Sequence, residues 1–85
     1  MKVKVLFFAA LREQLGIAAE EIELPADIST VAGLRSHLKS RGAAYEKALA
    51  EKNLVRIAVN QDMVPPTARI KAGDEVAFFP PVTGG

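Results

Sequence analysis

Alternating apolar and polar residues at the start of the chain predict a strand over residues 2–9. Val3, Val5 and Phe7 occupy one side of this strand and form a predicted core face. The other side begins with lysines and becomes apolar at Leu6 and Phe8. A strand with one fully solvated face would not show this change.

The same periodicity, with turn residues at the boundaries, predicts the other elements. Helices are predicted over residues 9–15, 29–41 and 43–52, and strands over residues 20–24, 54–59, 63–64 and 75–79. Gly16 is placed to end the first helix, and Pro25 ends the second strand. Ser29 or Thr30 can cap the second helix. Tight turns are expected at residues 60–62 and at residues 72–74, and the second of them leads into the last strand.

The second helix has a single apolar stripe, formed by Val31, Leu34 and Leu38. Gly33 lies within this helix, where glycine costs about 1 kcal/mol relative to alanine. We therefore expect Gly33 to mark a close approach between this helix and the sheet. In the third helix, Tyr45, Ala48 and Leu49 form the predicted packing side.

These elements predict an α+β fold, with one mixed sheet and the helices packed on one face. Residues 1–79 are expected to form a single domain, followed by an extended tail over residues 80–85. If the first and last strands are parallel neighbours, Phe8 and Phe79 lie side by side near the tail. Together with Leu6 and Met63 they would form an apolar patch on the uncovered sheet face, which is typical of a partner surface. Alternatively, a loop covers these side chains.

The size and composition of the chain argue against several classes of function. The chain has 85 residues, a net charge of +1 and no cysteine. Near-zero charge gives no electrostatic reason to expect a nucleic-acid or membrane partner. The lack of cysteine excludes disulfides and thiolate chemistry. No apolar run approaches the ~20 residues of a membrane span, and no signal peptide is evident, so we expect a cytoplasmic protein.

Candidate catalytic groups are sparse. His37 is the only histidine and is interpreted as solvated, and no metal site or phosphate-binding loop is predicted. Arg35, Lys39 and Arg41 are interpreted as a solvated helix face, with a partner contact as the alternative. Three glutamates have the spacing of a solvent-exposed strand face and do not suggest a pair of catalytic carboxylates: Glu20, Glu21 and Glu23. The sequence therefore predicts no enzyme that acts unaided.

The tail carries the one distinctive chemical group, the α-carboxylate of Gly85. Pro80 and Pro81 end the last strand and stiffen the segment that follows, and Gly84 and Gly85 have no Cβ to obstruct a close approach. One interpretation is an ordinary frayed end. The other is a tail inserted into a partner's site, where adenylation by ATP and displacement of AMP by a sulfur donor would leave a nucleophilic thiocarboxylate.

Several segments resemble one family, the small subunits of molybdopterin synthase. The resemblance is most specific over residues 71–85, KAGDEVAFFPPVTGG, and extends to residues 3–9, to Leu11-Arg12-Glu13 and to Val59-Asn60-Gln61. It implies a ubiquitin-like β-grasp fold. It also implies a sulfur carrier without a bound cofactor: an ATP-using adenylating enzyme activates the terminal glycine, and sulfur transfer gives the thiocarboxylate. The large subunit then uses that sulfur to build molybdopterin from cyclic pyranopterin monophosphate, in a heterotetramer.

Carried over by position, the resemblance assigns roles to individual residues. Gly85 is the modified residue, and Thr83 and Gly84 line the inserted tail. Four positions match partner contacts: Phe8, Arg12, Met63 and Phe79. Two alternatives share the Gly-Gly chemistry, namely a sulfur carrier for thiamin or tRNA thiolation and a ubiquitin-like modifier joined to lysines.

Overall fold

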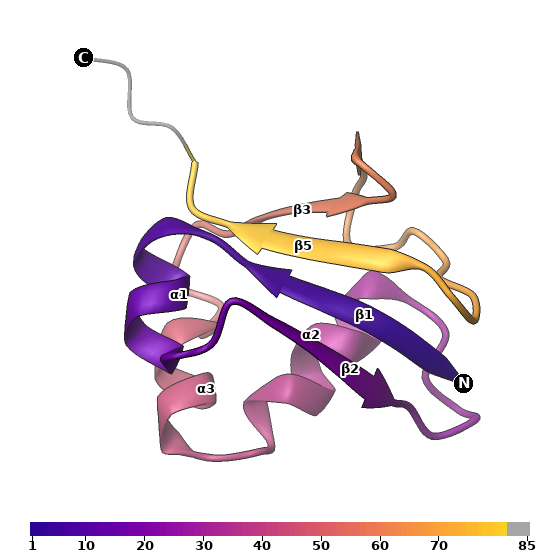
Figure 1. The fold of residues 1–85 in the computed structure, drawn as a ribbon, viewed down its shortest axis with the longest axis horizontal. Coiled ribbons are helices and arrows are strands. Elements are labelled where there is room, and N and C mark those ends of the chain that lie inside the picture. The colour runs from indigo at the N-terminus through magenta and orange to yellow at the C-terminus, as the bar shows by residue number, and fades with distance from the viewer. Residues whose placement is uncertain (82–85) are drawn as a thin grey trace.

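A computed structural model describes residues 1–81 and shows one mixed sheet backed by helices (Figure 1). The elements in chain order are β1 (Lys2–Phe7), α1 (Ala9–Leu15), β2 (Ala19–Glu23), α2 (Val31–Lys39), α3 (Ala43–Ala48), β3 (Arg56–Val59), β4 (Asp62–Met63) and β5 (Glu75–Phe79). The strands lie in the order β2-β1-β5-β3-β4. β1 and β5 are parallel neighbours at the centre, and the other pairs are antiparallel. The predicted α+β arrangement is confirmed.

The sheet and the helices share one core. It takes side chains from one sheet face and from all three described helices: Val3, Val5, Phe7, Leu11, Ile22, Leu24, Val31, Leu34, Leu38, Ala48, Leu49, Ile57, Ile70, Val76 and Phe78. At its centre Phe7 stacks on Phe78, with ring centroids 5.9 Å apart. Because these residues form a single cluster, the helices cover one face of the sheet and leave the other open.

Capping residues fix the start of α2 and the end of α1 as predicted, whereas α2 ends at Lys39, before the predicted residue 41. The Thr30 side chain accepts a hydrogen bond from the Gly33 backbone N–H at 3.1 Å, which begins α2. Gly16 has a φ of 72° and donates its N–H to the Arg12 carbonyl, which ends α1. The expected tight turn is a two-residue hairpin, in which Asn60 and Gln61 both have positive φ, typical of a type I′ turn.

Two expectations about α2 are wrong. A Cβ on Gly33 would meet Ile28 and Thr30, at 3.2 and 3.3 Å, so the close approach is to the segment that precedes the helix and not to the sheet. Arg35 is not solvated: its side chain is only 12% exposed and donates to the carbonyls of Leu49, Ala50 and Asn53. The reason is that the chain turns back after α3 and brings these carbonyls to the guanidinium group.

Several boundaries also differ from the prediction. α3 ends at Ala48 instead of residue 52, because the carbonyls that follow turn toward Arg35. β3 begins at Arg56 instead of residue 54, because Arg56 pairs with Phe79, the last residue of β5, so the strand has no partner beyond it. β1 ends at Phe7, and β2 begins one residue early at Ala19.

Candidate functional site

The candidate site is the end of the sheet where β5 passes into the tail (Figure 1). β5 ends at Phe79, and Pro80 and Pro81, here called the tail root, follow it. Neither proline has an N–H to extend the ladder, so the strand stops there. The three predicted tail residues Thr83, Gly84 and Gly85 lie outside the described part of the chain.

Phe8 and Phe79 are placed together by the parallel pairing of β1 and β5. Phe7 pairs with Phe78, and the Phe8 N–H donates to the Phe78 carbonyl at 3.1 Å, so the next residues of the two chains lie beside each other. Side chains alternate along a strand, and therefore Phe8 and Phe79 point away from the helices. Phe8 is 46% exposed and Phe79 is half-buried.

The strand register builds an apolar row across all five strands on the open face. Successive pairings join Ala19, Leu6, Ala77, Ala58 and Met63. Met63 at the end of this row is 54% exposed. Cross-strand neighbours lie about 4.8 Å apart, so the row runs continuously from one sheet edge to the other.

Together this row and the two phenylalanines form what we call the open-face patch. The predicted placement of Leu6, Phe8, Met63 and Phe79 on the open face is confirmed. Phe8 and Met63 are exposed, so no loop within residues 1–81 covers them, whereas Leu6 and Phe79 are half-buried and Ala58 in the row is buried. The three alanines were missed, because alanine gives no strong signal in a sequence. Only the register shows that they connect the larger side chains.

Charged residues border the open-face patch on two sides. Next to the apolar row, toward the start of β1, Lys4 pairs with Glu21 on one side and Glu75 on the other. On the tail side Arg56 pairs with Phe79 and is exposed. Arg12 is also exposed, on α1 one turn after Phe8. The patch therefore has a mixed charged border at one end and a positive border at the end from which the tail leaves.

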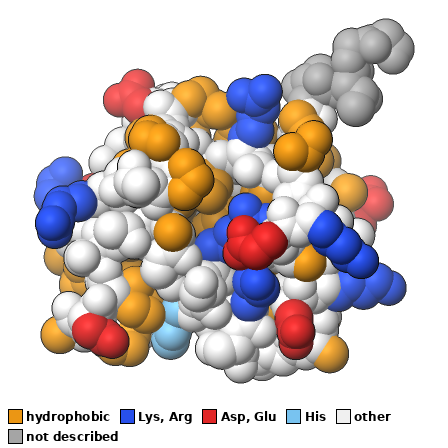
Figure 2. Space-filling view, turned by 180° about the vertical axis from the view of Figure 1, so that it is seen from behind, with side chains coloured by type: hydrophobic (Ala, Val, Ile, Leu, Met, Phe, Trp, Pro, Cys, Tyr) orange, Lys and Arg blue, Asp and Glu red, His pale blue; other side chains and the backbone are white. Residues whose placement is uncertain are grey.

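The opposite side of the molecule presents charged and apolar side chains mixed together (Figure 2). In Figure 2 basic and acidic side chains lie next to one another on the face turned away in Figure 1. Arg41 pairs with Glu20 at 2.6 Å, and Lys39 with Glu51 at 3.4 Å. The hydrogen bond to Glu20 raises the pKa of Arg41 further above its ordinary value. Because each of these basic groups lies beside an acidic one, the pairs do not form a charged patch of one sign.

Two further observations concern the described residues. No group of three side chains suited to hold a metal ion occurs within residues 1–81. None of the helices described is long and apolar enough to cross a membrane. What the structure offers at the tail root is a contact surface next to the point where the last four residues begin.

Comparison with known proteins identifies the family. The ThiS family model matches residues 5–85. The molybdopterin synthase sulfur carrier subunit of Escherichia coli is 47% identical over 83 residues, which cover 98% of this chain and 99% of the relative.

Two solved structures agree with this relationship. A putative molybdopterin converting factor subunit 1 from Pyrococcus furiosus superposes with a TM-score of 0.79 at 39% identity, covering 96% of this chain and 99% of that one. A complex of subunits 1 and 2 of the molybdopterin-converting factor from Helicobacter pylori matches with a TM-score of 0.66 at 25% identity, over the full length of both chains. The chain belongs to the ThiS family and groups within it with the molybdopterin synthase sulfur carrier subunits, which confirms the resemblance and the ubiquitin-like β-grasp fold expected from the sequence.

Proposed function

We propose that this protein is the sulfur carrier subunit of a molybdopterin synthase and that Gly85 carries the sulfur. The observation that supports this most strongly is the 47% identity to a sulfur carrier subunit along nearly the whole of both chains. The structure supports it with a compact body whose open-face patch adjoins the tail root.

The chemistry takes place in two partner sites. In an activating enzyme, a carboxylate oxygen of Gly85 attacks the α-phosphorus of ATP and releases pyrophosphate, giving an acyl-adenylate. A donor of sulfide-level sulfur (HS⁻) then attacks the carbonyl carbon, AMP leaves with the bonding electrons, and loss of the proton from sulfur gives the thiocarboxylate. In the large subunit the sulfur passes to cyclic pyranopterin monophosphate, and hydrolysis returns the Gly85 carboxylate. The carrier supplies no cofactor and acts through its partners.

The body of the carrier contributes recognition in this scheme. The open-face patch is the proposed contact surface for the large subunit, with Phe8, Met63 and Phe79 packing against apolar groups and Arg12 at the margin. Aromatic and methionine side chains are favoured in interface cores. Thr83 and Gly84 would pass through the narrow part of the partner's site, where glycine leaves room for the enclosing backbone.

Deleting Gly85 tests the proposal directly. We expect the truncated carrier to lose molybdopterin formation while its thermal unfolding midpoint stays unchanged, because the core found within residues 1–81 is complete by Phe78. The measurement combines an in vitro synthesis assay with intact mass after incubation with ATP, activating enzyme and sulfur donor. The complete chain should show one oxygen-to-sulfur exchange, and the truncated chain should show none.

Other outcomes would contradict the proposal. Normal synthesis by the truncated protein would show that the tail is not the site. Lysine adducts without a sulfur exchange would identify a modifier instead. Co-purification with a thiazole synthase or a tRNA-thiolating enzyme, in place of a pterin-converting subunit, would assign the carrier to another pathway.

A further inference from the structure

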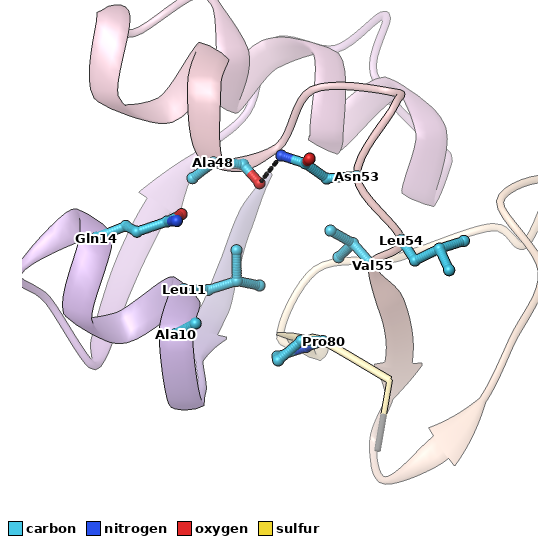
Figure 3. A pocket seen from close by; sticks show the side chains of 8 residues that line it. All are labelled: Ala10, Leu11, Gln14, Ala48, Asn53, Leu54, Val55 and Pro80. Carbon is cyan, nitrogen blue, oxygen red and sulfur yellow. Dashed lines mark hydrogen bonds between the residues drawn. The ribbon is translucent and has the colours of Figure 1, made fainter. Parts of the chain in front are cut away.

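A pocket separate from the open-face patch lies on the helix side of the tail root. It has a volume of about 160 Å³ and is lined by residues from α1, from the segment before β3 and from the tail root, among them Ala10, Leu11, Gln14, Leu54, Val55 and Pro80. Figure 3 shows Leu11 and Val55 pointing toward one another across it, with Pro80 close by. A cavity of about 150 Å³ holds a group the size of benzene, so this open pocket has room for one large side chain, with Leu11, Val55 and Pro80 as its apolar wall.

The walls of the pocket are held in place by the fold. Leu11 belongs to the core, and the Asn53 amide donates to the carbonyls of Lys47 and Ala48, at 2.8 and 3.3 Å. Arg35 binds the carbonyls of Leu49, Ala50 and Asn53 from the other side. A pocket with fixed walls costs little reorganisation when a ligand group enters.

The rim of the pocket carries an unusually exposed leucine. Leu54 is 80% exposed, more than Phe8 or Met63, the other large apolar side chains exposed within residues 1–81. Its side chain is turned outward beside the pocket in Figure 3. An exposed leucine beside a pocket walled by apolar side chains and two amides, Gln14 and Asn53, offers a partner both a recess and a projecting group.

The tail is short, so a partner that binds its last residue must lie close to the tail root and to this pocket. Four residues follow Pro81, and fully extended they span at most about 14 Å. A protein that encloses Gly85 must therefore place its surface within that distance of Pro81. Pro80, the neighbour of Pro81, is itself a wall of the pocket. A surface that surrounds the tail root consequently reaches the pocket as well as the open-face patch.

We propose that this pocket receives one apolar side chain of the large synthase subunit, of the size of leucine or phenylalanine. Leu54 packs beside it on that subunit, and the Gln14 amide at the pocket wall pairs with a polar backbone group there. The tail root would then be held on two sides, by the open-face patch and by the pocket. This inference rests on the proposed function, and the solved complex of the two subunits from H. pylori favours the large subunit as the occupant.

Two substitutions test the pocket. Leu54→Ser removes the projecting group, and Ala10→Met fills the recess with a residue that suits a helix. We expect each to raise the Kd of the full-length carrier for the large subunit about tenfold or more, as for a contact residue near an interface centre. Both positions are exposed, so the thermal midpoint should not change. Ala44→Met, the same change at an exposed position of α3, is the matched control.

The outcomes separate this inference from the proposed function. If both variants bind the large subunit as the unchanged protein does while Phe79→Asp binds weakly, the pocket proposal is wrong and the function stands. A loss of affinity confined to the activating enzyme would also overturn it. If Phe79→Asp and the Gly85 deletion leave binding and synthesis intact, the proposed function itself fails.

Discussion

Asp74 is the buried charged side chain among the described residues and stabilises the start of β5. One of its oxygens accepts the Lys71 backbone N–H at 2.8 Å, and the other accepts the Asn60 amide at 3.0 Å. Asn60 in turn accepts the Glu75 N–H at 3.0 Å. Burial raises the pKa of Asp74, but the hydrogen bonds from Lys71 and Asn60 outweigh this effect and lower it below the ordinary value.

The lowered pKa predicts a pH-dependent cost for Asp74→Asn. An amide has only one acceptor oxygen, so the variant should lose about 2 kcal/mol of unfolding free energy at pH 7, the scale of a hydrogen bond to a charged group. Because the folded pKa lies below the unfolded one, the advantage of the carboxylate is complete above the unfolded value of about 3.9 and is lost as the pH falls through the folded value.

Urea unfolding of both proteins between pH 7 and pH 3 measures this cost. The gap in unfolding free energy should narrow toward the acidic end. A constant gap would mean that the charge of Asp74 does not contribute to stability.

Phe79 gives a second prediction at the scale of one residue. Phe79→Asp should weaken binding to the large subunit about 30-fold, the effect of losing a central aromatic contact. The introduced carboxylate would face Arg56, its cross-strand neighbour, so the fold should tolerate it. Calorimetric titration measures the affinity, and Phe79→Leu is the matched apolar control. Loss of folding with unchanged affinity would place this side chain in the core instead.

At the scale of elements, the sequence predicts the end of a helix or strand correctly where one local residue determines it. β5 ends where Pro80 removes a donor, and α2 begins where Thr30 caps it. The prediction from sequence is wrong where a boundary depends on pairing with a residue far away in the chain. The apolar residues Leu54 and Val55 predict a longer β3, but a strand needs a neighbour, and β5 stops opposite Arg56. The pocket at the tail root was missed for the same reason, because it is formed where the unpaired residues pass α1.

Arg35 links α2 to the segment that leads into β3. Its guanidinium group satisfies three partly buried carbonyls, at 2.9, 2.9 and 3.2 Å. Arg35→Ala should therefore reduce the free energy of unfolding by about 2–3 kcal/mol, because the carbonyls lose a charged donor. Arg35→Lys should restore only part of this, since an ammonium group lacks the planar fork.

Chemical denaturation of these variants gives the free energies. Lys39→Ala is the control, because its pair with Glu51 is at the surface and should contribute at most about 1 kcal/mol. Equal effects at the two positions would refute a structural role specific to Arg35.

At the scale of the whole molecule, one face of the sheet contributes to the stability of the fold and the other to the proposed recognition of a partner. One sheet face and the helices form the core, and the other face carries the open-face patch. The sequence predicted this division, because Leu6 and Phe8 are apolar on the strand side that the core does not use. It could not predict that Ala77 and Ala58 join Leu6 to Met63, because strand order and register depend on pairings between distant segments.

The central position of β5 also affects how the protein is made. β5 is the last of the described strands to be synthesised, yet it lies between β1 and β3. Until it emerges, β1 and β3 lack the strand that joins them, and the edges they turn toward β5 in the complete sheet have no neighbour. The sheet cannot be completed before β5, the strand that leads into the tail, has been synthesised. A chain that stops before residue 75 therefore has no assembled contact surface to offer, and folding itself excludes such incomplete carriers from the assembly.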